Sequence, residues 1–514
     1  MGLFRKNDYE KGLKAYQAKK INEAKGYWEN GVNNGNADCM YALGSLYCHP
    51  DFGMVDEAKA FSYFLMAAER GHKFGLLYAG ERLVYGNGTE KDPKRGLEFL
   101  RMAVSKGMYN AKKLILDVEK ALSMENKGDD ITGEEAYKLA LSYLKGEGVG
   151  INYDKGYEML KKAAEKGNAD AISDLADCYF HGVKVKKNIP EAFRLYEIAA
   201  GKEFGRAQYV MAVFYFEGLH VDKNMAEGLK WLKKSADNGY HEAQLMIGDM
   251  YLNGREVPCN PELGVSYLKK AEQQNNYKAS LLLGHCYYYG IGTEKDYEAA
   301  HYNLKIAYLN DVKEASLLLG YLKVFHSKGT RKDYDQGFSY FNDAEKLNLP
   351  GACAALGYCY DRGIGTDNFP HAAEEYYKKA LDDPRTQPEE YTQVCYNLAV
   401  LYGKRKQLSS DIDKSIFYFI EASKRGDNNA TLNLGLLYYY GVKIDGKVIL
   451  AKDDSKAFLY LKSALEEGNE KAARYLKSDL SGLLPRYQVG LGEKIADVFD
   501  VISSELIDAF VAKL

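Results

Sequence analysis

Apolar residues recur along the chain at helical spacing, in runs of 12–14 residues that end at a glycine. One such run is AQLMIGDMYLNG, from Ala243 to Gly254. A short loop follows it, and a second amphipathic run, PELGVSYLKKAEQQ, extends from Pro261 to Gln274. Helices of this length are marginal in isolation, so they require neighbours to pack against. The pattern predicts pairs of antiparallel helices, each stable only within a stack.

The pairs repeat with a period of 36 residues. Three sets of positions keep this interval: small residues at Ala140, Ala176, Ala212, Gly248, Gly284 and Gly320, alanines at Ala171, Ala207, Ala243, Ala279 and Ala315, and tyrosines at Tyr143, Tyr179, Tyr215, Tyr251 and Tyr287. Small residues allow helices to approach closely, and larger ones fill the layer between them. We therefore predict an all-α fold, a right-handed α-α superhelix (solenoid), in place of separate globular domains.

Irregularities in the repeat suggest four segments. Residues 1–107 hold N-terminal repeats, and residues 108–133 hold an extra helix near 110–124 followed by a polar stretch that we interpret as a hinge. Residues 134–481 form the main array, and residues 482–514 form a linker with a C-terminal amphipathic helix. A further insertion falls near 445–452.

The repeated pattern resembles the Sel1-like repeat, a relative of the tetratricopeptide repeat. It reads Ala-x3-Leu-Gly/Ala-x2-Tyr-x2-Gly-x-Gly, followed by Asp…Ala-x2-Tyr/Phe-x2-Ala-Ala-x2-Gly, and residues 134–171 match it almost throughout. About twelve full units extend from residue 7 to residue 468, and the first is closer to a plain tetratricopeptide unit. The resemblance implies a scaffold or adaptor that mediates protein–protein interactions.

Composition and charge narrow the class of partner. The chain has 69 Lys and Arg residues against 72 Asp and Glu residues, a net charge of −3, so it has no broad basic surface for nucleic acid. No signal peptide or apolar stretch long enough to span a membrane is visible. Eight scattered cysteines favour reduced thiols and a cytoplasmic location. We expect protein or peptide partners.

Candidate catalytic and cofactor motifs are weak. The paired glycines, such as Gly290 and Gly292, recur at one repeat position and indicate turns, because no phosphate-binding motif accompanies them. Ser142-Tyr-Leu-Lys145 and Ser266-Tyr-Leu-Lys269 match the SxxK motif of β-lactam-recognising enzymes, but no KTG or SDN follows. The nine histidines form no metal-binding motif. We expect no enzyme activity, cofactor or metal; a β-lactamase-like hydrolase is a minor alternative.

The concave face is the main candidate binding surface. In tetratricopeptide-type solenoids the first helix of each pair lines it, which places inner-facing residues nine, six and two positions before the repeated tyrosine and one or two after it. Tyrosine suits peptide recognition because it offers a large contact area with few rotors, although these rings could simply complete the packing between helices. The resulting candidates are Asp177, Phe180, His181, Tyr209, Phe216, Asp249, Asn253, His285, Tyr288, Tyr289, Tyr321, Phe325, Tyr358, Asp361, Arg362, Tyr439 and Tyr440.

The C-terminal segment is a second candidate. Residues 493–514 carry an apolar stripe at helical spacing and a net charge of −3, which is unsuited to an anionic membrane surface. The helix would either cap the last repeat or dock on another chain, which leaves a homodimer open. A further alternative is that the protein is a regulatory subunit that contacts its partner through this helix.

Overall fold

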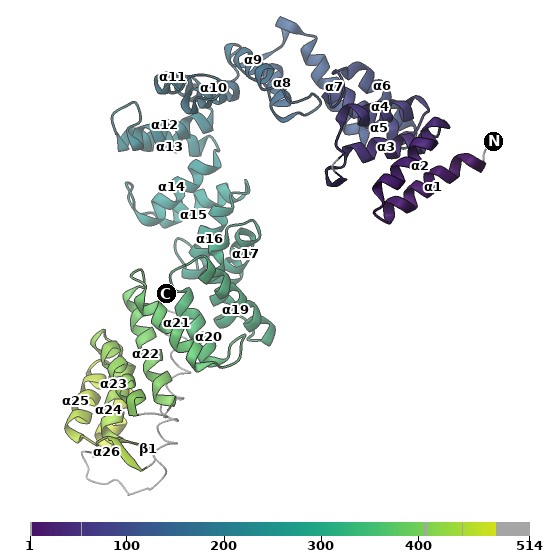
Figure 1. Ribbon diagram of the computed structural model, residues 1–514. Coiled ribbons are helices and arrows are strands. Elements are labelled where there is room, and N and C mark those ends of the chain that lie inside the picture. Colours follow the sequence, from purple (N-terminus) through teal and green to yellow (C-terminus); the bar gives the residue numbers. More distant parts are fainter. Residues whose placement is uncertain (1–2, 53, 406–408, 445, 480–514) are drawn as a thin grey trace. The chain divides into compact units, whose positions relative to one another are not determined.

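A computed structural model describes residues 3–52, 54–405, 409–444 and 446–479 of the chain. Within these residues it contains twelve helix pairs, two unpaired helices and one short β-hairpin (Figure 1). The all-α repeat architecture predicted from the sequence is confirmed. The predicted C-terminal helix lies outside the described residues.

Contacts along the chain divide it into two units, residues 1–240 and 241–514. The first unit contains helix α7 (Ala111–Glu125), the 3₁₀ turns η1 (Pro50–Phe52) and η2 (Gly128–Asp130), and six pairs. These pairs are α1 (Leu3–Gln17) with α2 (Ile21–Asn33), α3 (Ala37–Cys48) with α4 (Glu57–Glu69), α5 (Lys73–Tyr85) with α6 (Pro93–Ser105), α8 (Gly133–Lys145) with α9 (Tyr153–Glu165), α10 (Ala169–His181) with α11 (Ile189–Gly201), and α12 (Gly205–Glu217) with α13 (Met225–Asp237).

The second unit also contains six pairs, together with η3 (Lys313–Ala315), α26 (Glu470–Asp479) and the antiparallel strands β1 (Val442–Ile444) and β2 (Lys447–Leu450). The hairpin occupies the insertion seen in the sequence. The pairs are α14 (His241–Asn253) with α15 (Pro261–Glu272), α16 (Tyr277–Tyr289) with α17 (Tyr297–Leu309), α18 (Ser316–Phe325) with α19 (Arg331–Lys346), α20 (Ala352–Arg362) with α21 (Pro370–Asp382), α22 (Pro388–Arg405) with α23 (Ser409–Lys424), and α24 (Asn428–Tyr440) with α25 (Asp454–Glu466).

The division between the units falls after α13, whereas the sequence suggested a hinge at 108–133. That segment contains the extra helix α7 and the turn η2, and Lys162 of α9 binds the carbonyl of Gly128 and the carboxylate of Asp129. The hinge and the four-segment division therefore stay predictions.

Local signals at both ends of the loop define each pair. First helices end at a glycine in the left-handed conformation, as at Gly146, Gly182 and Gly290. Second helices begin at an Asn or Asp whose side chain accepts a hydrogen bond from the backbone two or three residues on, as at Asn152 and Asn188. These caps explain why nearly every repeat turns at the same place.

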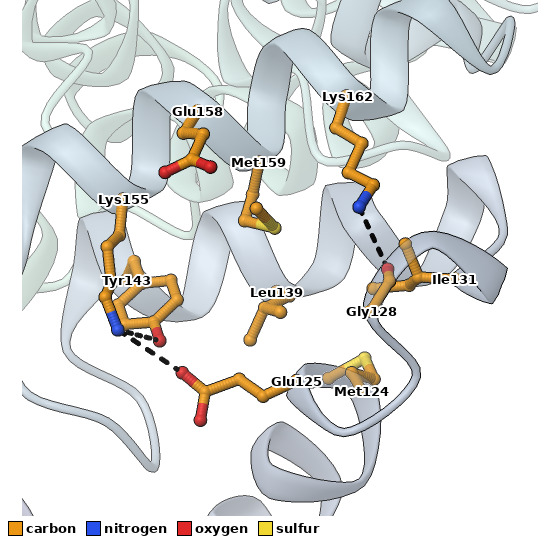
Figure 2. Close-up of a pocket in the computed structure, with 10 residues that line it drawn as sticks. All are labelled: Met124, Glu125, Gly128, Ile131, Leu139, Tyr143, Lys155, Glu158, Met159 and Lys162. Carbon is orange, nitrogen blue, oxygen red and sulfur yellow. Dashed lines mark hydrogen bonds and ion pairs between the residues drawn. The ribbon is translucent and has the colours of Figure 1, made fainter.

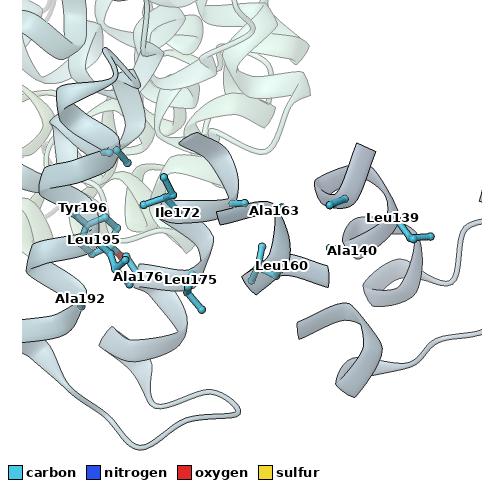
Figure 3. Close-up of a cluster of buried hydrophobic side chains, with 14 of the residues drawn as sticks. Leu139, Ala140, Leu160, Ala163, Ile172, Leu175, Ala176, Ala192, Leu195 and Tyr196 are labelled. Carbon is cyan, nitrogen blue, oxygen red and sulfur yellow. The ribbon is translucent and has the colours of Figure 1, made fainter. Parts of the chain in front are cut away.

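The core follows the repeated small residues (Figure 3). Ala140, Ala176 and the five alanines from Ala171 to Ala315 are fully buried. A Cβ atom added to Gly284 would lie 2.4 Å from Cγ of Leu304 in the paired helix, which shows how closely the two helices approach. The small-residue positions thus determine the distance between helices.

The repeated tyrosine has a partner in the second helix. Tyr251 stacks on Tyr267 with ring centroids 6.2 Å apart and planes inclined by 4°, and the same stack recurs between Tyr402 and Tyr418 at 5.9 Å. Parallel offset rings of this kind hold the two helices of a pair together near the loop. Much of the chain's tyrosine content therefore serves packing.

Candidate binding surfaces

Residues two positions before and after the repeated tyrosine gather on α16, α18 and α20 in the second unit. We name this set the aromatic surface; it consists of His285, Tyr289, Tyr321, Phe325, Tyr358 and Arg362. Phe325 connects two of the helices, because its ring lies 5.9 Å from that of Tyr321 and 5.5 Å from that of Tyr358. The guanidinium of Arg362 lies 5.9 Å from the Tyr358 ring. The sequence analysis selected all six residues.

Most members of the aromatic surface are half-buried, and Tyr321 is buried with 7% of its surface exposed. Burial raises the pKa of the Tyr321 and Tyr358 phenols and lowers the pKa of His285. The two phenols therefore stay protonated at neutral pH. Partly exposed rings with hydroxyl and guanidinium groups at their edges suit contact with a peptide.

Three candidates one position after the repeated tyrosine, on α12, α16 and α24, point into the pair instead. Phe216, Tyr288 and Tyr439 expose at most 8% of their surface. A Cβ atom added to Gly228 of α13 would lie 2.4 Å from the Phe216 ring, so this side chain packs against the second helix of its own pair. Consecutive side chains on a helix point about 100° apart, so these residues face away from the exposed side of the first helix. We therefore leave these residues out of the proposed binding surface.

Four further candidates of the second unit lie outside the aromatic surface: Asp361, Asp249, Asn253 and Tyr440. Asp361 is buried with 6% exposed, 3.4 Å from Nε of Arg362. Asn253 donates a 2.8 Å hydrogen bond to Asp249 on the same helix, and Tyr440 packs against Tyr439 on α24. None of these four belongs to the aromatic surface.

Sequence reasoning missed Glu390, near the start of α22. Only 7% of this residue is exposed, and its Oε1 atom accepts no hydrogen bond from any residue that the structure describes. A Cβ atom added to Gly351 would lie 3.2 Å from this oxygen and 3.7 Å from the Tyr321 hydroxyl. Burial, and the charge of Asp383, raise the pKa of Glu390 to about 6. No sequence signal distinguishes this carboxyl from exposed ones in first helical turns.

One candidate of the first unit, Asp177, belongs to a polar network. Arg206 of α12 pairs with Asp174 and Asp177 of α10. The Tyr137 hydroxyl donates a 2.9 Å hydrogen bond to Asp174, and the Tyr196 hydroxyl donates one to Asp177. We name these five residues the Arg206 network. Its charged groups satisfy one another, so it offers few free ligands to a partner.

The other candidates of the first unit are separate from this network. Phe180 is half-buried beside the exposed His181, with ring centroids 5.0 Å apart, and Tyr209 lies 5.4 Å from Tyr240. They do not form a continuous surface comparable to the aromatic surface.

A cavity of about 330 Å³ lies between α7, α8 and α9 (Figure 2). Its apolar lining includes Met124, Leu139 and Met159, and Figure 2 shows Lys155 and Glu125 at one end and Lys162 at the other. Lys155 lies 3.4 Å from the Tyr143 hydroxyl and 3.9 Å from Glu125 at one end. Lys162 donates to the Gly128 carbonyl at the other end, over 2.9 Å.

The position of α7 explains this cavity. In regular repeats a loop glycine lies against the first residue of the second helix in the preceding repeat. Gly88 lies against Glu57 in this way. The equivalent Gly148 meets Asp117, in the middle of α7. The regular helix α4 continues for twelve residues beyond its contact residue Glu57, to Glu69. Helix α7 continues for only eight residues beyond its contact residue Asp117, to Glu125. The cavity thus forms where about one helical turn is missing.

A second cavity of about 490 Å³, which we name the leucine groove, lies across α14, α16 and η3. Several of its residues occupy the inner-facing positions that the sequence rule defines, nine, six and two places before the repeated tyrosine. Its lining comprises the apolar Leu245, Met246, Leu281, Leu282 and Val312 and the charged Asp249, Lys278, Asp311 and Glu314.

The structure places one of the SxxK serines and the groups that commonly bind metals. The hydroxyl of Ser266 donates to the Leu263 carbonyl of its own helix over 2.7 Å. No three His, Cys, Asp or Glu side chains there lie close enough together to hold a metal ion, and all eight cysteines are free thiols. In the same part of the chain, no helix has the length and apolarity to cross a membrane.

The profile of the Sel1 repeat family matches eleven segments of the chain. They cover residues 37–72, 75–108, 136–168, 169–202, 205–240, 241–276, 278–312, 313–348, 350–383, 392–427 and 429–469. The pair α1–α2 precedes these segments, in agreement with the atypical first unit noted in the sequence.

Two yeast proteins from Saccharomyces cerevisiae are similar to parts of the chain. The chitin synthase regulator SKT5 is 26% identical over 180 residues, which is 31% of this chain and 26% of that protein. The activator of C kinase protein 1 is 29% identical over 133 residues, 24% of this chain and 20% of that protein. The chain thus spans about a quarter of each relative.

Solved structures of similar proteins include two with the same kind of repeat. A protective antigen of uropathogenic Escherichia coli with an SLR fold is 20% identical, with 99% of this chain and 94% of the antigen covered and a TM-score of 0.41. A Sel1 repeat protein from Oxalobacter formigenes is 25% identical, with 49% of this chain and 99% of that protein covered and a TM-score of 0.40.

Proposed function

The chain belongs to the Sel1 repeat family, and from this premise we propose that it is a non-catalytic scaffold that binds segments of partner proteins along the exposed side of its first helices. The observation that supports this most directly is the aromatic surface, where six residues lie at two equivalent positions of three consecutive first helices and four of them, on α18 and α20, contact one another in series. Multipoint contact with such a preformed surface limits the ordering cost of binding.

The relatives point to the same class of function. Both are named as a regulator or an activator of another protein. A repeat array that holds a partner in place fits that role without any catalytic group of its own. We propose a cytoplasmic location on the same grounds as in the sequence analysis.

Capture of partners from a native lysate tests the proposal. Replacing Tyr289 and Phe325 with serine removes two half-buried rings from the aromatic surface, and we expect most partner protein to be lost. The matched control replaces Tyr302 and Leu309 of α17, which are 63% and 66% exposed, with serine. Mass spectrometry identifies the captured proteins, and circular dichroism monitors folding. Equal capture by both variants would refute a role for the aromatic surface.

The C-terminal segment provides the alternative, a regulatory subunit that contacts its partner through residues 493–514. Truncation near Pro485 separates the two hypotheses. Loss of capture or of dimer mass after truncation, with the aromatic surface intact, would favour the terminal segment. Unchanged capture together with a lower melting temperature would identify it as a cap. A chromogenic β-lactam assay tests the hydrolase alternative, which requires turnover that Ser142→Ala or Ser266→Ala abolishes.

A further inference from the structure

The leucine groove combines positions from three consecutive repeats. Leu245 and Leu281 occupy the position six residues before the repeated tyrosine, Lys278 and Glu314 the position nine before it, and Asp249 the position two before it. Its volume of about 490 Å³ lies in the range of pockets that bind ligands. It is therefore a candidate for the place where a partner segment inserts side chains.

The floor of the groove is aliphatic. Leu245 and Leu282 pack from below on the core that contains Val265 and Leu268, and Leu281 and Val312 pack on the core of the next repeat. All four residues are half-buried, so part of each side chain still faces the groove. Unbranched or branched aliphatic side chains of a partner would cover this remaining apolar surface.

The rim of the groove is mainly acidic. Asp311 and Glu314 are exposed at one end, and Asp249 lies at the other end, where Arg255 is 3.7 Å from its carboxylate. Lys278 is the single basic residue of the lining. The nearby Lys313 donates to the Tyr308 carbonyl over 2.7 Å, and the same ammonium group lies 3.9 Å from the Asp311 carboxylate. The end formed by Asp311 and Glu314 thus has two carboxylates against one ammonium group and favours a further cation.

The groove continues into the aromatic surface along one helix. On α16, Lys278, Leu282, His285 and Tyr289 follow one another at intervals of three or four residues, which places them on one side of the helix. A segment bound in the groove could thus extend over His285 and Tyr289.

We propose that the leucine groove binds a partner segment in which aliphatic residues are flanked by lysine or arginine. The aliphatic side chains contact Leu245, Met246 and Leu281, and a basic side chain pairs with Asp311 or Glu314. This proposal rests on the scaffold function proposed above and specifies the chemistry of the bound segment.

A fluorescein-labelled glycine–serine peptide that carries two leucines flanked by lysines serves as the probe for fluorescence anisotropy with the full chain. We expect it to bind about tenfold more tightly than the same peptide with glutamate in place of lysine, because the rim is acidic. Replacing its leucines with serine should weaken binding to a similar extent. Equal binding of the lysine and glutamate peptides would overturn the proposal.

Charge reversal identifies the site. Asp311→Lys combined with Glu314→Lys should weaken the lysine peptide about tenfold and improve the glutamate peptide. Glu256→Lys with Glu294→Lys makes the same charge change in two loops outside the groove and should leave the preference intact. Lys278→Glu should strengthen binding of the lysine peptide, a gain that unfolding cannot produce.

The leucine-groove proposal and the scaffold function can be refuted independently. If a captured partner is lost with the Tyr289 and Phe325 variant but the Asp311 and Glu314 variant changes neither capture nor peptide preference, the groove proposal is wrong and the scaffold function stands. If neither the wild type nor any variant captures a protein, the scaffold function itself fails.

Discussion

Equivalent positions differ between the last three first helices of the first unit and the first three of the second. The positions six and five residues before the repeated tyrosine hold Tyr137, Lys138, Ser173, Asp174, Tyr209 and Val210 in α8, α10 and α12, and Leu245, Met246, Leu281, Leu282, Leu317 and Leu318 in α14, α16 and α18. The buried small residues keep the same positions in both, with Ala140, Ala176 and Ala212 in the first unit and Gly248, Gly284 and Gly320 in the second. The backbone of a repeat therefore tolerates either surface.

This difference has a chemical consequence. In the first unit two of these side chains, Tyr137 and Asp174, are bound to each other and Asp174 also pairs with Arg206, and in the second unit the equivalent side chains leave an apolar groove beside half-buried rings. Polar groups that already have partners add rigidity and offer little to a ligand, whereas exposed apolar surface gains free energy when it is covered. We infer that partner binding depends more on the second unit.

The largest expected effect comes from the positions that both units share. Gly284→Ala places a methyl group 2.4 Å from Leu304, and we expect a loss of about 2–3 kcal/mol in the free energy of unfolding. Gly201→Ala is the control: no atom lies within 4 Å of its added Cβ, and the change should be neutral or stabilise by about 0.5 kcal/mol. Urea unfolding followed by circular dichroism measures both. Similar results for the two variants would show that the glycine positions do not control packing.

The buried carboxyl beneath the aromatic surface gives a pH-dependent effect. The pKa of Glu390 is about 6 in the fold against 4.5 in a free glutamate, so folding favours its protonated form. Wild-type stability should fall by about 2 kcal/mol as pH rises from 4.5 through 6. Glu390→Gln removes this loss, so the variant should gain relative to the wild type above pH 6 but not below pH 4.5. Urea unfolding at several pH values measures this, and a stability difference between the variant and the wild type that stays constant with pH would contradict the prediction.

The smallest expected change in stability comes from one repeat position, compared between the two units. Arg206 and Lys278 both lie nine residues before the repeated tyrosine position. Arg206→Ala leaves Asp174 and Asp177 without their cation, and we expect a loss of about 1 kcal/mol after allowing for solvent screening. Lys278→Ala, at an exposed side chain, should change stability by less than about 0.5 kcal/mol. Thermal unfolding at low and high salt measures both, and equal losses would remove the distinction.

The aromatic surface shows how far repeat arithmetic can predict a site. The intervals selected Phe325, Tyr358 and Arg362, whose side chains lie in contact in the fold, and their role in binding stays a prediction. They also selected Tyr288 and Phe216, because a register counted in whole residues does not show which of two neighbours faces the second helix. Glu390 could not be found in this way, since its burial depends on an irregular connection after α21.

The sequence by itself determined the architecture: small residues, glycine stops and Asn or Asp caps at a constant interval specify pairs of helices, because each acts through contacts within its own repeat or with the next one. Only the tertiary structure decided which side chains remain accessible, how α7 opens a cavity, and that Leu245, Leu281 and Glu314 line one groove. The reason is physical. Accessibility depends on the angle and spacing between neighbouring helices, and the loss of about one turn, as at the end of α7, changes it without altering the repeat pattern.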